Sequence, residues 1–118
     1  MQFLVVDDSA VDRHLLTNLL EELGHQADVF TSTQGLIDKI AAGNYASIFL
    51  DVVMPEQDGY KFLRTLRSNP ATAKQHVILY SSKKTALEIN YGLKRAGANE
   101  YLVKPANKET LTEVLNKI

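Results

Sequence analysis

Three aspartates, a serine and a lysine stand where short apolar segments of the chain end. They are Asp7, Asp8, Asp51, Ser81 and Lys104. Carboxylates that share a site repel one another and require a cation, and Mg²⁺ prefers such oxygen ligands. A hydroxyl and an ammonium group beside them are suited to bind an anion such as phosphate. These residue types therefore predict a magnesium-dependent phosphoryl site, if the fold brings the five side chains together.

Five short apolar segments are typical of β-strands. They cover residues 3–6, 27–30, 46–50, 77–80 and 101–103. Between and after them, apolar residues recur at a spacing of three and four, which predicts amphipathic helices that pack on a sheet. Val11 in the first helix and Leu87 in the fourth belong to these apolar positions. Ser9, Ser32 and Asn107 are the predicted N-caps.

The regular alternation of strand and helix predicts an α/β fold with a parallel sheet that is covered on both faces. The first, third and fourth strands lack polar alternation and are expected in the centre, whereas Asp28 favours an edge position for the second strand. Lys61, Arg64 and Arg67, spaced by three, predict a solvated stripe on the third helix. In open sheets of this kind, ligands bind outside the carboxyl ends of the strands. The five candidate residues are therefore expected to meet there.

Composition excludes several classes of function. The chain has 118 residues, 13 basic and 14 acidic, so one domain is expected and direct binding to nucleic acid is not. Cysteine is absent, which excludes disulfides and thiolate metal sites and fits a reducing compartment. The start of the chain becomes acidic too soon for a signal peptide, and no apolar stretch approaches membrane-spanning length. We therefore expect a cytoplasmic protein without membrane insertion.

Asp51 is the candidate nucleophile, because it is an acid between two apolar segments. A charge near a core costs free energy unless it is paired, and a carboxylate in that setting can attack phosphorus to give an aspartyl phosphate. A carboxylate that caps the following turn would explain Asp51 equally well. Val53 could add its carbonyl oxygen as a ligand for Mg²⁺. Each of these residue types is also common for structural reasons, as first-turn acids, strand-end serines or surface lysines. The prediction of a phosphoryl site therefore depends on suitable residues at the ends of four different strands.

The chain resembles the receiver domain of two-component response regulators over essentially its whole length. The resemblance is carried by residues 4–9 (LVVDDS), 50–59 (LDVVMPEQDG) and 97–105 (GANEYLVKP). It implies a flavodoxin-like (βα)5 fold, doubly wound around a parallel five-stranded sheet of order 2-1-3-4-5. It also implies that residues 1–118 form one receiver domain, with no effector domain in this chain. Residues 81–101 are similar to chemotaxis-like regulators of twitching or phototactic motility.

The resemblance also assigns roles to the candidate residues. It implies that Asp51 accepts a phosphoryl group from a histidine kinase, a phosphotransfer protein or a small donor such as acetyl phosphate. Asp8, Asp51 and the carbonyl of Val53 would bind Mg²⁺ directly, Asp7 would act through water, and Lys104 would pair with the phosphoryl oxygens. Acceptance and self-dephosphorylation would be the only reactions, so no enzyme in the usual sense is expected.

Two further residues would form the switch by the same resemblance. Ser81 would bond the phosphoryl group and draw in the loop after the fourth strand, and Tyr101 would then turn from an exposed to a buried rotamer. A protein partner would read this change on the surface of the fourth helix, fifth strand and fifth helix. Val53 offers no polar side chain to orient attacking water, from which we expect slow self-dephosphorylation.

Three other functions compete with this interpretation. A haloacid-dehalogenase-like phosphatase would need a second acid two residues after the nucleophile, where this chain has Val53. A nucleotide-binding fold would need a glycine-rich loop after the first strand, where Asp7 and Asp8 stand. The third alternative is a receiver fold that serves as a scaffold or dimerisation module without phosphorylation.

Overall fold

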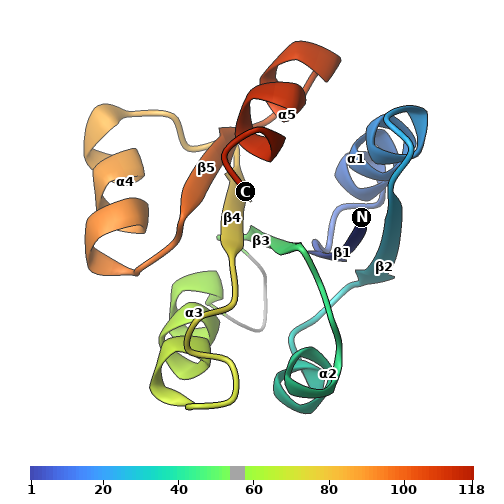
Figure 1. Cartoon of the computed structure of the whole chain (residues 1–118). Coiled ribbons are helices and arrows are strands. Elements are labelled where there is room, and N and C mark those ends of the chain that lie inside the picture. The colour runs from blue at the N-terminus through green and yellow to red at the C-terminus, as the bar shows by residue number, and fades with distance from the viewer. Residues whose placement is uncertain (54–57) are drawn as a thin grey trace.

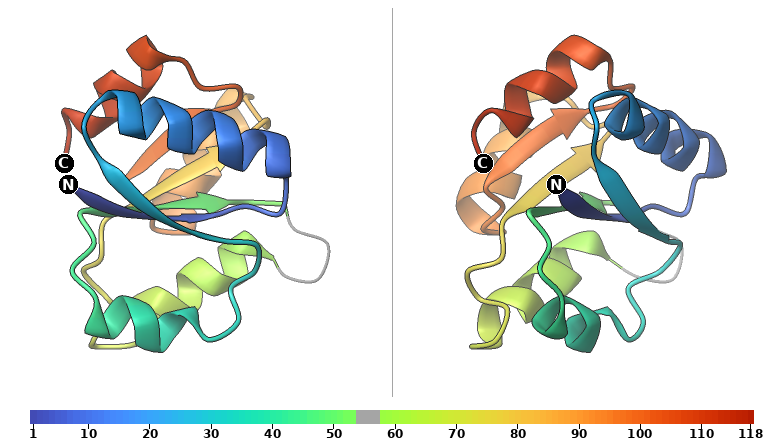
Figure 2. Two further views of the ribbon diagram at one scale, coloured as in Figure 1. Left: turned by 90° about the vertical axis from the view of Figure 1, so that its right-hand side faces the viewer. Right: turned by 45° about the vertical axis from the view of Figure 1, so that its right-hand side comes forward.

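The computed structural model describes residues 1–53 and 58–118. The motif residues Met54, Pro55, Glu56 and Gln57 lie outside the described residues. Five parallel strands form one sheet in the order β2-β1-β3-β4-β5, and helices lie on both of its faces (Figures 1 and 2). The strands are β1 (Gln2–Val6), β2 (Gln26–Phe30), β3 (Ser47–Asp51), β4 (Val77–Ser81) and β5 (Glu100–Val103). The helices are α1 (Ala10–Glu22), α2 (Leu36–Ala42), α3 (Gly59–Ser68), α4 (Ala86–Asn90), the one-turn π-helix η1 (Tyr91–Arg95) and α5 (Lys108–Leu115).

Two apolar clusters, one on each face of the sheet, hold the layers together. On one face, α1 and α5 pack through side chains such as Leu16 and Leu111 onto Phe3 and Phe49 of the sheet. On the other face, side chains of α2, α3 and η1 cover the alternate residues of the same strands. Every residue of β3 and β4 is buried, as expected of central strands with both faces covered. The predicted α/β class, strand order and central or edge positions are confirmed.

Two strands that contribute to the site, β3 and β4, end one residue later than the sequence predicts. Asp51 and Ser81 are the last residues of β3 and β4, and do not follow those strands as predicted. Asp51 is in register with Tyr80, and Ser81 with Val103. Their backbones are therefore fixed by the sheet, and the polar side chains start from rigid positions.

The predicted N-caps at Ser9 and Asn107 are confirmed, because their side chains accept hydrogen bonds from Asp12 N and Thr110 N. The prediction at Ser32 is wrong. A turn closed by the Leu36 N–H, which donates to the Thr33 carbonyl at 3.2 Å, comes after Ser32. Helix α2 begins only after Gly35, whose φ of 73° suits glycine.

The predicted core positions of Val11 and Leu87 are wrong, and so is the predicted surface position of Arg67. Val11 and Leu87 are 78% and 81% exposed, because each lies in the first turn of its helix, on the side away from the sheet. Arg67 is partly buried and does not belong to the solvated stripe that includes Lys61 and Arg64. No helix among the described residues is long and apolar enough to cross a membrane.

Candidate functional site

The carboxyl ends of β1, β3, β4 and β5 surround a crevice of about 410 Å³. Its lining residues are Asp8, Ser9, Asp12, Asp51, Val53, Ser81, Ser82, Lys104 and Pro105. Asp7 lies beneath this crevice, fully buried, and pairs with Lys104. The fold thus brings together all five residues with which the sequence argument began. Tyr101 lies on β5 and does not line the crevice.

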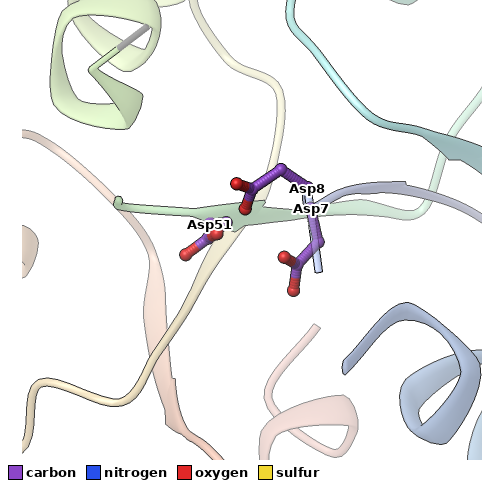
Figure 3. Close-up of side chains that lie close together, drawn as sticks. All are labelled: Asp7, Asp8 and Asp51. Carbon is purple, nitrogen blue, oxygen red and sulfur yellow. The ribbon is translucent and has the colours of Figure 1, made fainter. Parts of the chain in front are cut away.

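Three carboxylates converge at this edge of the sheet. Asp7, Asp8 and Asp51 each have an oxygen within 4.8 Å of the others (Figure 3). Asp7 and Asp51 are buried, whereas Asp8 is exposed. A divalent cation would relieve the repulsion among them, and an all-oxygen donor set with an open side fits Mg²⁺, which retains several waters. The residues present therefore fit a magnesium ion.

Asp7 is held rigidly in place. Its Oδ1 accepts a hydrogen bond from Ser9 N at 2.9 Å, and its Oδ2 forms an ion pair with Lys104 Nζ at 2.8 Å. The guanidinium of Arg13 donates to the Asp7 carbonyl at 2.9 Å. Both carboxylate oxygens are thus engaged within the protein. That arrangement leaves Asp8 and Asp51 with more freedom to bind a ligand directly.

Asp51 is a carboxylate with a strongly perturbed affinity for protons. Burial, followed by the negative charge of Asp7, raises its pKa from 3.8 to about 7. Lys104 and a hydrogen bond from Val53 N to Asp51 Oδ1, 3.3 Å long, act in the opposite direction. The charge on Asp51 is therefore poorly satisfied by the protein alone. A cation in the crevice would favour the ionised form.

Lys104 forms ion pairs with three carboxylates. Its ammonium lies 2.8 Å from Asp7 Oδ2, 3.0 Å from Asp12 Oδ2 and 3.6 Å from Asp51 Oδ1. Burial lowers the pKa of Lys104, but its bonds to Asp7 and Asp12 and the charge of Asp51 outweigh burial and raise the pKa to about 12. The backbone turns here through a cis bond between Lys104 and Pro105. A permanent positive charge therefore stands beside Asp51.

Asp12 is the functional candidate that the sequence argument missed. It lies in the first turn of α1, where an acid is usually explained by the helix dipole. The signal that could have found it is its position four residues after Asp8. Asp8 lies just before the N-cap of α1, and a carboxylate in the first turn of that helix can face the same crevice.

Ser81 and Tyr101 both bind Lys83, the second residue after β4. Lys83 N donates to Ser81 Oγ at 3.1 Å, and Tyr101 Oη donates to the Lys83 carbonyl at 2.7 Å. Ser81 is buried and Tyr101 is partly buried. The backbone of Lys83 thus connects a hydroxyl in the crevice to an aromatic ring outside it.

Val53 lies on the opposite rim of the crevice and is 57% exposed. It forms an isolated antiparallel bridge with Asp58, whose side chain caps α3 by accepting from Tyr60 N at 2.9 Å. Gly59, the first residue of α3, lies so close to β3 that a Cβ there would overlap the Asp51 carbonyl. Sequence analysis of the motif does not reveal this close approach.

Several known proteins are similar to this chain in sequence. Residues 3–116 match the model of the family described as the response regulator receiver domain. Protein PilH of Pseudomonas aeruginosa is 33% identical over 120 residues, which cover 99% of this chain and 96% of PilH. Protein PilG of the same organism is 34% identical over 113 residues, which cover 94% of this chain and 82% of PilG.

A solved structure also resembles the fold of this chain. The chemotaxis protein CheY4 of Vibrio cholerae superimposes with a TM-score of 0.86 at 25% identity, covering 99% of this chain and 97% of CheY4. The sheet order and the acidic strand ends described above are consistent with the family match. Because the family model spans nearly the whole sequence, the chain belongs to the response regulator receiver domain family.

Proposed function

We propose that this receiver domain is a phosphorylation-activated switch and that Asp51 is its phosphoryl acceptor. The observation that carries the proposal is the buried Asp51 carboxylate, which lies beside the Asp7 and Asp8 carboxylates and 3.6 Å from the Lys104 ammonium. An acid with two acidic neighbours and one cationic neighbour is suited to a site where metal and phosphate bind together.

Asp8, Asp51 and the carbonyl of Val53 would hold Mg²⁺. Asp7 would act through water, because its two carboxylate oxygens already bind Ser9 N and Lys104. The ion, when bound, would neutralise negative charge that the phosphoryl group brings to Asp51. Lys104 would also neutralise part of this charge.

In the transfer, an Asp51 carboxylate oxygen forms a bond to phosphorus as the bond from phosphorus to the donor breaks. The donor would be a phosphohistidine of a histidine kinase or phosphotransfer protein, or an acyl phosphate such as acetyl phosphate. The later reaction with water returns inorganic phosphate and the free carboxylate. The chain thus accepts and loses one group and turns over no other substrate.

The switch would operate through Lys83. A phosphoryl oxygen that accepts a bond from the Ser81 hydroxyl would draw Ser81 inward, and Lys83, whose N–H donates to Ser81 Oγ, would follow. The loop would then move and weaken the bond from Tyr101 Oη to the Lys83 carbonyl. The expected exposed rotamer of Tyr101 is not the one in this structure, where its ring already packs against the core. Phosphorylation would instead shift this packed ring, and a protein partner would read the change on α4, β5 and α5.

The similarity to chemotaxis-type regulators supports a proposal about the cellular setting. We propose a cytoplasmic switch in a chemotaxis-like motility system, with a histidine kinase or phosphotransfer protein upstream and an output protein downstream. The charges that would face an output partner include exposed Lys84, Lys94 and Arg95. An acidic partner would complement them.

The test is a titration of the protein with beryllofluoride, an analogue of the phosphoryl group, in Mg²⁺, followed by backbone amide resonances. We expect saturable shifts at Ser82 and Lys83 and around Tyr101, which require Mg²⁺. Ser81→Ala should still bind the analogue but lose the shifts around Tyr101. Binding without any change at Lys83 or Tyr101 would contradict the switch and favour a phosphorylation-independent scaffold.

A further inference from the structure

Asp12 is a fourth carboxylate of the crevice, and the metal and phosphoryl roles leave it without a function. We propose that Asp12 is a positioning residue that retains Lys104 near α1 and thereby limits the affinity of the crevice for a phosphoryl group. This inference rests on the proposed function of Asp51. It concerns how strongly the unmodified domain resists phosphorylation.

The Lys104 ammonium lies at unequal distances from the three carboxylates that surround it. Nζ is closer to Asp12 Oδ2, at 3.0 Å, than to Asp51 Oδ1, at 3.6 Å, and closest to Asp7 Oδ2, at 2.8 Å. The bond to Asp12 is a hydrogen bond as well as an ion pair. The shortest contacts of the Lys104 ammonium are therefore with Asp7 and Asp12, not with Asp51.

The backbone of Asp12 is held in place by the N-cap of α1. Its N–H donates to Ser9 Oγ at 3.3 Å, which is the N-cap interaction that fixes the first turn of α1. Its side chain is 28% exposed and that of Lys104 is 10% exposed, so water screens the pair less than a surface ion pair. The contact is therefore strong enough to affect where Lys104 stands.

The negative charge of Asp12 disfavours a phosphoryl group on Asp51 in two ways. An ammonium has three hydrogens to donate, and Lys104 donates one of them to Asp12 while it forms an ion pair with Asp7. A phosphoryl group on Asp51 adds negative charge, which attracts Lys104 toward Asp51 and is repelled by the Asp12 carboxylate. Both effects act in the same direction. Loss of the Asp12 charge should therefore favour the phosphorylated form.

Asp12→Asn tests this because an amide oxygen can still accept from Lys104 while the charge is removed. Asp12→Glu restores the charge on a longer side chain. Glu109→Gln is the matched control, since Glu109 is an exposed first-turn acid of α5 and does not line the crevice. The measurement is the dissociation constant for beryllofluoride at saturating Mg²⁺, together with the ¹⁵N resonance of the Lys104 ammonium without ligand.

We expect Asp12→Asn to bind beryllofluoride about fivefold more tightly than the wild type. Asp12→Glu should return the affinity toward wild type, and Glu109→Gln should not change it. The Lys104 ammonium resonance should shift in Asp12→Asn alone. The gain in affinity should be smaller when Lys104 is also replaced by Gln, because only the direct repulsion by Asp12 is then relieved.

An Asp12→Asn variant with unchanged or weaker affinity would overturn the inference, as would an equal gain in the Lys104→Gln background. The proposed function fails differently. It fails if wild-type protein does not bind beryllofluoride, or if Asp51→Asn binds it as well as the wild type. The ammonium resonance distinguishes the cases, because it tests the contact between Asp12 and Lys104 without any ligand.

Discussion

Among single residues, the charge balance around Asp51 determines what the site can do. One buried ammonium faces Asp7, Asp12 and Asp51, and Asp8 adds a fourth carboxylate to the same crevice. Negative charge exceeds positive charge in the crevice, so the metal-free site should favour protonated Asp51. Ionisation, metal binding and phosphorylation at this position are therefore linked.

The raised pKa of Asp51 makes stability depend on pH. Between pH 3.8 and about 7, folded Asp51 keeps a proton that the unfolded chain has lost. The free energy of unfolding should therefore fall as pH rises through this window. From pH 5 to pH 8 without Mg²⁺, we expect the wild type to lose roughly 2 to 3 kcal/mol relative to Asp51→Asn.

Urea unfolding of both proteins at several pH values measures this difference. Contributions from other titrating groups, such as His76, are shared by the two proteins and cancel. Parallel curves for wild type and Asp51→Asn would mean that Asp51 titrates as an ordinary surface acid.

The side chain of Val53 should govern how long a phosphoryl group remains on Asp51. Val53 lies on the exposed rim of the crevice and has no polar atom in its side chain to orient water. Val53→Asn should shorten the lifetime severalfold, and Val53→Ala should change it less. Phosphate release after removal of the donor measures the lifetime. Equal shortening in both variants would mean that bulk, and not polarity, is what matters.

The five strand-end residues could be predicted from the sequence because a parallel sheet carries all its carboxyl ends to one edge. Asp12 was not predicted, because the helix dipole already explains an acid in the first turn of α1 without a ligand. The connection through Lys83 could not be predicted either. It depends on a backbone carbonyl, and every residue has one.

At the level of elements, β3 and α3 meet more closely than the sequence indicates. The sequence suggests that Gly59 only relaxes the backbone before α3, but the described structure shows contact with the end of β3. A Cβ at position 59 would overlap the Asp51 carbonyl and lie 2.9 Å from Val52 Cα. Any side chain at this position must therefore displace either α3 or the strand that carries Asp51.

Gly59→Ala should consequently weaken both the fold and the metal site. We expect a loss of about 2 kcal/mol in unfolding free energy and weaker Mg²⁺ binding. Gly24→Ala is the control, because Gly24 has a φ of 84° but no atom within 4 Å of the added Cβ. It should cost about 1 kcal/mol from backbone strain and leave Mg²⁺ binding unchanged. Unchanged Mg²⁺ affinity in Gly59→Ala would show that β3 tolerates the displacement.

The starts of two helices were predicted from their capping residues, but the caps of α3 at Asp58 and of α4 at Thr85 were not predicted. Ser9 and Asn107 cap α1 and α5, whereas α2 begins after Gly35 through a turn that Ser32 does not enter. The short α4 continues into the π-helix η1, in which Gly92 is buried beside Leu79. Such a change of helical pitch depends on tertiary packing, which apolar spacing alone does not reveal.

Across the whole molecule, Arg67 links α3 to the loops before β4 and β5. Its guanidinium donates to the carbonyls of Gly97 at 3.0 Å, Ala73 at 3.2 Å and Gln75 at 2.7 Å, and to Asn99 Oδ1 at 3.0 Å. These contacts lie at the amino ends of β4 and β5, opposite the crevice. Arg67 therefore supports the sheet without touching the site.

Arg67→Lys should lower the free energy of unfolding by about 2 kcal/mol, because an ammonium cannot reproduce the planar set of donors. Beryllofluoride affinity should stay at the wild-type value. Arg64→Lys, on the exposed face of the same helix, should change stability by less than about 0.5 kcal/mol. Chemical denaturation and ligand titration of the three proteins provide the comparison. A large loss of affinity in Arg67→Lys would mean that the two ends of the sheet are coupled.

The central claim is that Asp51 accepts a phosphoryl group in a reaction that needs Mg²⁺. Intact-mass measurement after incubation with acetyl phosphate and Mg²⁺ tests it most directly, with Asp51→Asn and a chelator as controls. The wild type should gain the mass of one phosphoryl group, and it should gain none with the chelator or in Asp51→Asn. An equal gain in Asp51→Asn, or a gain that ignores Mg²⁺, would contradict the assignment of both the acceptor and the metal site.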